Sequence, residues 1–186
     1  MPTQAAVYHQ NCFGQKGAGI PVSENGRLLP DVVKVMEICA ENDIIFATGH
    51  SAPEESILMA AKAHEMGFKK LVVTHPNTTV WKMTADQIKR CAELGAYIEY
   101  CYLGRLWGEG TAMPEYVRQS GEEFLNYVNI VPERSFISTD LGQYGMPNPL
   151  DGMRACIKEL QQAGLGQRVI DILVRKNPAY LIGLEG

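Results

Sequence analysis

The sequence predicts an α/β fold with a parallel sheet. Short apolar runs alternate with segments of helical spacing along the chain, and this order is typical of successive (β/α) units. The clearest unit spans residues 43–76, where two apolar runs flank one amphipathic helix. Parallel strands joined by a helix end at the same edge of their sheet. We therefore expect the residues that follow these strands to lie side by side.

The first elements follow from local patterns. Residues 4–26 predict an irregular loop, because they are rich in Gly, Gln and Asn and end in the turn signal Asn25-Gly26. Residues 30–42 have apolar side chains along one face and predict an amphipathic helix. Residues 44–47 form a short apolar run that suits a strand buried on both faces.

The central helix is expected to begin with Ser51 and Glu54 as a capping box and to end at Gly67. Residues 71–73 then predict a second buried strand. Because one helix joins these two strands, they are expected to pair in parallel.

The second half of the chain continues the alternation. Thr84 and Gln87 predict another capped helix, which runs to residue 94. Glu99 falls inside the next strand and is either an ion-pair partner or an acid of a site, since a buried carboxylate needs a partner. The predicted elements are a strand at 96–103, a helix at 114–129, a strand at 135–139, helices at about 150–163 and 167–175, and a closing helix capped by Asn177.

The composition limits the classes of function. The 186 residues suit one domain over 1–186, with an ordinary apolar fraction of 46%. The net charge of -4, without a basic cluster, argues against a nucleic-acid partner. We see no apolar run near the roughly 20 residues of a membrane helix and no secretory signal, so no membrane association is expected. Five cysteines without paired spacing favour a cytoplasmic protein over a disulfide framework.

Three residues that carry chemistry each follow a short apolar strand: His50, His75 and Asp140. Imidazole nitrogens and carboxylate oxygens are ligands of first-row metals, and three protein ligands with open positions are typical of catalytic sites. The sequence therefore predicts a metal site, with Asp140 also as general base. The alternative is that each histidine only caps a turn. His9 either reaches the same edge or is a surface histidine.

Other residues have open interpretations. Trp81 and Trp107 either line a substrate pocket or pack in the core. His64 is interpreted as a solvated or packing residue of its helix. Glu54 and Glu55 suit the first helical turn, where the helix dipole favours acids, or one of them accepts a hydrogen bond from His50.

These motifs resemble the later metal-binding strands of the amidohydrolase superfamily. The resemblance is carried by the strand-end residues of ATGHS, VVTHP and ISTDLG, and the closing KNPAYLIGL is similar to the C-terminal helix of that superfamily. The segments PTQAAVYH and GHSAPEE also resemble a branch of metal-dependent hydrolase-like proteins. The resemblance covers nearly the whole chain.

The resemblance implies a TIM-like (β/α) barrel, a mono- or binuclear divalent metal centre and hydrolysis of an amide, ester or related C–N or C–O bond in a small-molecule substrate. Zinc is the expected metal, with iron or manganese as alternatives, and deamination or decarboxylation are alternative reactions. His50 and His75 would be the ligands of strands five and six, and Asp140 the ligand and base of strand eight. His9 would stand near the strand-four ligand.

The chain departs from the superfamily because it has no His-x-His strand. By the resemblance, residues 1–3 would end strand four, so the chain is expected to be half a barrel, about strands four to eight. A second protein chain, a missing N-terminal half or a second copy would complete it. A different class of function is a non-catalytic partner or scaffold subunit that retains the fold.

Overall fold

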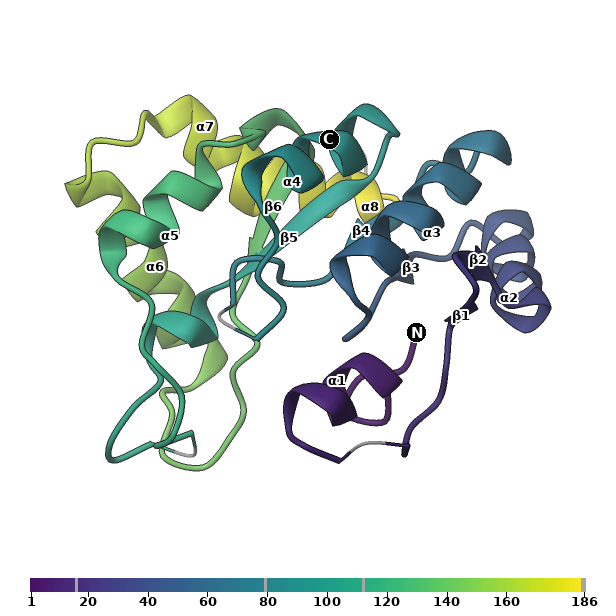
Figure 1. Cartoon of the computed structure of the whole chain (residues 1–186). Coiled ribbons are helices and arrows are strands. Elements are labelled where there is room, and N and C mark those ends of the chain that lie inside the picture. The colour runs from purple at the N-terminus through teal and green to yellow at the C-terminus, as the bar shows by residue number, and fades with distance from the viewer. Residues whose placement is uncertain (16, 79, 112, 185–186) are drawn as a thin grey trace. The chain divides into compact units, whose positions relative to one another are not determined.

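The computed structural model describes residues 1–15, 17–78, 80–111 and 113–184 (Figure 1). These residues form an α/β fold whose main sheet has four parallel strands in the order β3-β4-β5-β6. Each strand pairs with the next one along the chain, as expected for successive (β/α) units. The predicted α/β class is therefore confirmed, while the half TIM-like barrel stays a prediction.

The chain divides into two compact units. Unit 1 comprises Met1–Pro76 and Val80–Ile98, and unit 2 comprises Asn77–Thr79 and Glu99–Gly186. Strand β5 (Tyr97–Cys101) begins in unit 1 and ends in unit 2. The expectation of one domain over residues 1–186 stays a prediction.

Unit 1 contains the predicted strand–helix–strand centre and an N-terminal region that is more regular than expected. The prediction of a loop at residues 4–26 is wrong, because a short helix and a hairpin lie there. Asn25 and Gly26 form the hairpin turn with φ angles of 51° and 72°, as a tight two-residue turn requires. The elements are α1 (Val7–Cys12), β1 (Ser23–Glu24), β2 (Arg27–Leu28), α2 (Pro30–Glu41), β3 (Phe46–Ala47), α3 (Pro53–Glu65), β4 (Leu71–Val73) and α4 (Ala85–Glu93).

Helix ends in unit 1 follow local chemistry. Thr84 and Gln87 cap α4 reciprocally, as predicted: the Thr84 hydroxyl accepts from the Gln87 backbone at 3.2 Å, and the Gln87 side chain accepts from the Thr84 backbone at 2.9 Å. The predicted start of α3 is one residue early. Glu55, and not Glu54, accepts from the Ala52 backbone at 2.8 Å. Helix α3 ends before Gly67, whose φ of 69° stops it as expected.

Strand β3 is shorter than the apolar run that predicts it. Pairing with β4 begins at Phe46, which is 3% exposed, whereas Ile44 is 52% exposed. The prediction of a buried strand from residue 44 is thus wrong at its start. The core of unit 1 instead centres on Phe46 and on β4, where Leu71 and Val73 are 1% exposed.

Unit 2 holds the remaining strands and the longer helices. The predicted helix at 114–129 starts later, because the Ser120 hydroxyl accepts from the Glu123 backbone at 3.0 Å and so caps a helix that begins at Gly121. The elements are the end of β5, η1 (Tyr102–Arg105), α5 (Gly121–Val128), η2 (Pro132–Arg134), β6 (Ser135–Ser138), α6 (Pro149–Gln162), α7 (Gln167–Asp171), the π-helical η3 (Ile172–Lys176) and α8 (Asn177–Leu181).

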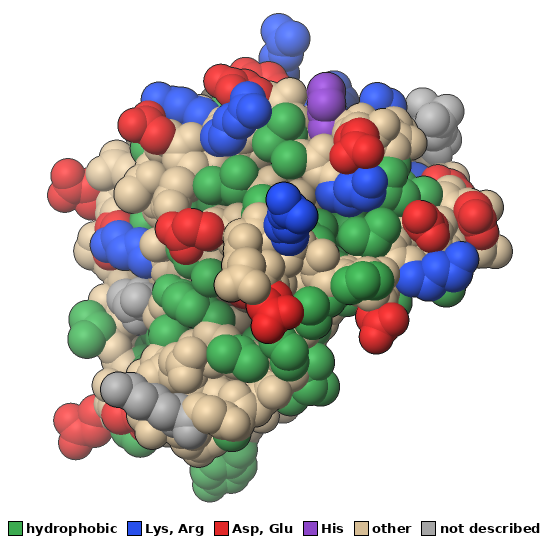
Figure 2. Space-filling view, turned by 45° about the vertical axis from the view of Figure 1, so that its right-hand side comes forward, with side chains coloured by type: hydrophobic (Ala, Val, Ile, Leu, Met, Phe, Trp, Pro, Cys, Tyr) green, Lys and Arg blue, Asp and Glu red, His purple; other side chains and the backbone are tan. Residues whose placement is uncertain are grey.

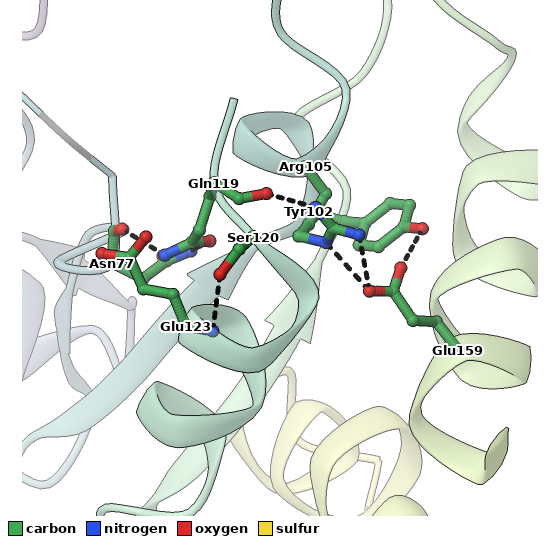
Figure 3. A network of polar contacts seen from close by, with 7 residues as sticks. All are labelled: Asn77, Tyr102, Arg105, Gln119, Ser120, Glu123 and Glu159. Carbon is green, nitrogen blue, oxygen red and sulfur yellow. Dashed lines mark hydrogen bonds and ion pairs between the residues drawn. The ribbon is translucent and has the colours of Figure 1, made fainter. Parts of the chain in front are cut away.

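A buried polar network fixes the end of the segment between η1 and α5 (Figure 3). The Gln119 side chain is 2% exposed; it accepts from the Asn77 amide at 3.1 Å and donates to the Asn77 carbonyl at 2.7 Å. Arg105 donates to the Gln119 carbonyl and to Glu159, which also accepts from the Tyr102 hydroxyl at 2.7 Å. These bonds tie the segment to η1 and to α6.

The last helices run together without a break. The prediction that Asn177 caps a separate helix is wrong, since the preceding residue Lys176 is itself helical. The Asn177 amide instead donates to the carbonyls of Glu133 and Ser135, at 3.2 and 2.6 Å. It therefore joins the helical run to the start of β6.

The surface carries charges of both signs. On the face in Figure 2, acidic and basic side chains are interspersed with apolar ones. Within the described ranges, we find no helix that is long and apolar enough to cross a membrane.

Candidate metal centre

Three histidines from separate elements gather in unit 1. His50 follows β3, His75 follows β4 and His9 lies in α1. The Nδ1 atoms of His9 and His50 are 2.9 Å apart, and their ring centroids are 5.0 Å apart. The ring centroids of His50 and His75 are 4.9 Å apart. We call His9, His50 and His75 the histidine cluster.

Two threonines lock the strand ends that carry His50 and His75. The Thr48 hydroxyl accepts from the Thr74 backbone at 3.1 Å, and the Thr74 hydroxyl accepts from the Gly49 backbone at 3.0 Å. These reciprocal bonds join the end of β3 to the end of β4 directly before the two histidines. Thr48 and Thr74 are thus positioning residues that sequence reasoning missed, although the shared Thr in ATGH and VVTH was a signal.

Gly49 allows the turn that presents His50. Its φ is 65°, and a Cβ atom there would clash with the backbone carbonyls of Met1 and Pro2. The His50 backbone donates to the Pro2 carbonyl at 3.0 Å, so the turn is also held from this side. Only glycine fits both the backbone conformation and the close approach.

The histidine cluster favours neutral imidazoles. Burial, together with the neighbouring His75 and His9, lowers the pKa of His50 to about 3. Burial also lowers the pKa of His75 to about 4, and that of His9 falls for the same reason. Neutral imidazoles keep a lone pair on one ring nitrogen, which is the form that binds metals.

The donor chemistry of the cluster fits a divalent metal. Two nitrogens bound to one tetrahedral Zn²⁺ at about 2.0–2.1 Å would lie about 3.3 Å apart. The 2.9 Å between the Nδ1 atoms of His9 and His50 is within a few tenths of that spacing. As the rings stand, however, no group of three or more His, Cys, Asp or Glu side chains in the described ranges is placed to hold a metal ion.

Trp81 lies against all three rings of the cluster. Its ring centroid is 4.1 Å from that of His50, 4.8 Å from that of His75 and 5.5 Å from that of His9. Trp81 is 8% exposed, and its indole nitrogen is buried without a hydrogen-bond partner among the residues that the structure describes. It therefore forms a wall of the candidate site.

Asp140 belongs to unit 2, where it follows β6 with a φ of 53°. Desolvation raises the pKa of its carboxyl. The sequence predicts that Asp140 converges with His50 and His75. Asp140 lies in unit 2 and both histidines lie in unit 1, so this convergence stays a prediction. The structure brings together His9, His50 and His75; their role as metal ligands is likewise a prediction.

Glu99 also lies in unit 2, in the middle of β5. Burial raises the pKa of Glu99 and the charge of Asp140 adds to this rise, while a hydrogen bond with Ser138 opposes it. Ser138 also contacts the Cys101 thiol at 3.1 Å. Glu99 is therefore a buried carboxyl group with a raised pKa and a hydroxyl as its hydrogen-bond partner.

The other candidates have structural contacts. Glu54 accepts from Gln87, and Glu55 accepts from Ser23 and Ala52, so the bonds described for these acids do not involve His50. His64 is exposed, and its ring contacts the Leu94 carbonyl at 3.2 Å. Trp107 packs against Tyr116 in unit 2 at 4.8 Å, which favours the packing interpretation for this tryptophan.

The fold and this site define an α/β protein with histidines gathered at the ends of neighbouring parallel strands. Residues 1–99 match the model of a family of unknown function, DUF6282. This is more than half of the 186 residues, so the chain belongs to that family. The matched part ends within β5 and includes the whole histidine cluster. No curated protein matches the chain.

Proposed function

We propose that the chain is part of a metal-dependent hydrolase of the amidohydrolase type, acting on an amide, ester or related C–N or C–O bond of a small molecule. The observation that carries this proposal is the gathering of His9, His50 and His75 beyond the ends of β3 and β4. Loops at the carboxyl ends of parallel strands are where α/β folds build their sites.

In this proposal the histidine cluster and Asp140 hold a divalent metal ion, most simply Zn²⁺, with iron or manganese as alternatives. Three neutral imidazoles are a suitable donor set, and the low pKa values of His50 and His75 keep them neutral at pH 7. When bound, such an ion lowers the pKa of water and polarises a carbonyl group.

The proposed chemical role of Asp140 is to accept the proton that leaves the attacking water. Desolvation raises the pKa of Asp140, so its carboxylate is a stronger base than an ordinary aspartate. Replacing it by asparagine keeps the volume but removes the base. We therefore expect Asp140→Asn to fold like the parent and to lose most hydrolytic activity towards a panel of esters and amides.

Zinc binding by the purified chain tests the proposal directly. We expect calorimetry with Zn²⁺ to show binding that His50→Ala and His75→Ala each weaken by more than the roughly 10–100-fold cost of losing an outer-shell partner, because each removes a ligand itself. The matched control is His64→Ala, which removes an exposed histidine of α3 and should leave binding unchanged.

A failure to bind Zn²⁺, by the chain alone and together with any protein that co-purifies, would contradict the proposal. It would favour the alternative of a non-catalytic partner or scaffold subunit that retains the fold. Unchanged hydrolysis in Asp140→Asn at saturating Zn²⁺ would contradict the role of Asp140 alone.

We further propose that a second protein chain pairs with unit 1. Strand β3 stands at one end of the four-stranded order, and parallel strands usually lie inside sheets that are covered on both faces. Apolar side chains nearby in the sequence are exposed: Ile20 at 57%, Val35 at 41%, Ile38 at 45% and Ile44 at 52%. A chain that supplies earlier barrel strands fits this edge better than a second copy, which would also lack a His-x-His strand.

A further inference from the structure

Trp81 packs against all three imidazoles of the histidine cluster. Aromatic rings whose centroids lie about 4.5–7 Å apart are in packing contact. Trp81 is within 5.5 Å of His9, His50 and His75 by ring centroid, and it stacks on His9 at an interplanar angle of 23°. Trp81 is therefore in packing contact with every imidazole of the histidine cluster.

The three imidazoles lie close together, but they are not arranged to hold one ion. The imidazoles lie about as close as ligands of one ion, with the Nδ1 atoms of His9 and His50 2.9 Å apart. Nevertheless, no metal-binding group of three or more side chains is formed in the part of the chain that the structure describes. The imidazoles are therefore close enough to share an ion but are not oriented to do so. Trp81 is the side chain that packs on all three imidazoles.

The closed position has an unfavourable component for Trp81 itself. Its indole N–H is buried without a hydrogen-bond partner among the described residues, which costs free energy that an outward rotation would recover. The opposing term is the apolar surface of the indole, which is 8% exposed here and would be wetted. The two terms have opposite signs, so they partly cancel in the free energy of moving the ring.

We propose that Trp81 is a gate of the histidine cluster, which must leave the three imidazoles before a divalent cation binds to them. This inference rests on the proposed metal-binding function of the cluster. A closed gate reduces the apparent affinity by the fraction of molecules that are open. Removing the indole should therefore tighten cation binding, whereas removing a histidine should weaken it.

The test uses Zn²⁺ alone and two readouts. Zn²⁺ has a filled d shell and does not itself quench indole emission, so a change of emission reports a change around the ring. The chain has two tryptophans, and Trp107→Phe leaves Trp81 as the only one. We expect its emission to shift to longer wavelength with the same midpoint as the calorimetric titration.

The matched variant is Trp81→Phe, which retains Trp107 and should show no emission change with Zn²⁺. If Trp107→Phe does not fold, subtraction of the Trp81→Phe spectrum from that of the parent gives the same reading. In Trp81→Ala we expect Zn²⁺ to bind about tenfold more tightly, as for a gate that is open in roughly a tenth of molecules.

The outcomes separate the gate from the proposed function. Zn²⁺ binding with unchanged Trp81 emission and unchanged affinity in Trp81→Ala would overturn the gate and leave the metal site standing. Zn²⁺ binding by both proteins, tighter in Trp81→Ala than in the parent, would support the gate. Absence of binding in both proteins would overturn the gate and the metal site together.

Discussion

His75 and Asp140 share an unusual backbone conformation. Their φ angles are 30° and 53°, and a single threonine separates each residue from the end of its strand. Positive φ angles are uncommon for residues other than glycine and persist where the surrounding structure fixes them. For His75, the threonine pair at the ends of β3 and β4 provides that constraint. Strain of this kind often accompanies residues with a chemical role, as the proposal gives to both.

The neutral state of His75 predicts how the metal-free chain responds to acid. Unfolded histidine titrates near pH ~6.5, whereas burial lowers the pKa of His75 to about 4. Between these values the unfolded state binds a proton that the folded state does not, so stability falls as the pH falls. The slope for one histidine is about 1.4 kcal/mol per pH unit. Acidification from pH 7 to 5 should cost on the order of 2 kcal/mol at this site.

Urea unfolding of the chain in EDTA at several pH values measures this effect. His75→Gln removes the titrating group, so its free energy of unfolding should change less steeply between pH 6.5 and 5 than that of the parent. The difference between the two proteins cancels the contributions of the carboxyl groups. Parallel pH profiles would show that His75 is not held neutral by the fold.

The strand-end positions of His50 and His75 were predictable from the sequence. A short apolar run followed by a polar residue suffices to place a side chain at the end of a parallel strand. The contacts of Trp81 were not predictable, since they depend on the path of a loop that has no periodic pattern. The approach of His9 to His50 depends in turn on α1, which the sequence did not reveal.

At the scale of elements, boundaries set by local bonds were predicted best. The capping box of Thr84 and Gln87 and the stop at Gly67 involve only neighbours in the chain. The errors involve distant partners. The amide of Asn177 donates to carbonyls 42 and 44 residues away, and so it does not cap a helix.

The segment before α5 shows the same effect. A proline at position 114 suggested a helix start there, since proline is favoured in the first turn. The side chain of Gln119 instead reaches Asn77, 42 residues away, and the helix starts after the Ser120 cap. A single sequence carries no signal for such a pairing of two amides.

This pairing predicts a large loss of stability in Gln119→Leu. The substitution keeps a similar volume but removes one acceptor and one donor from Asn77, which is fully buried. Leaving buried polar groups unpaired costs about 1–3 kcal/mol. We expect the free energy of unfolding, measured by urea titration with circular dichroism, to fall by roughly 2–3 kcal/mol.

The neighbouring Ser120→Ala is the matched control. It removes the cap of α5 at an exposed helix end, where the expected loss is about 1 kcal/mol. The polar network of Figure 3 should therefore respond more strongly to Gln119 than to the residue next to it. Similar losses in the two variants would mean that the pairing with Asn77 contributes little.

For the whole molecule, the sequence predicted the α/β class because alternating apolar and amphipathic segments leave few other arrangements. Closure into a barrel depends on strand tilt and stagger, and a sequence pattern does not encode these directly. The same patterns did not decide whether a second protein chain or a second copy of this chain completes the barrel. The assembly of the chain must therefore be determined by experiment.

We expect the purified chain to associate with another protein. Burial of apolar surface contributes roughly 25 cal/mol per Å², and the exposed Ile44 lies just before the end strand β3, separated from it by Ile45 alone. Light scattering should give a mass above the 20.6 kDa of one chain, or a second protein should co-purify.

Ile44→Lys should weaken this association, because it places a charge beside the strand edge. The control is Val117→Lys, at a side chain of unit 2 that is 72% exposed. A folded monomer without a co-purifying protein would contradict the proposed partner, and a mass that is a multiple of 20.6 kDa would favour a second copy instead.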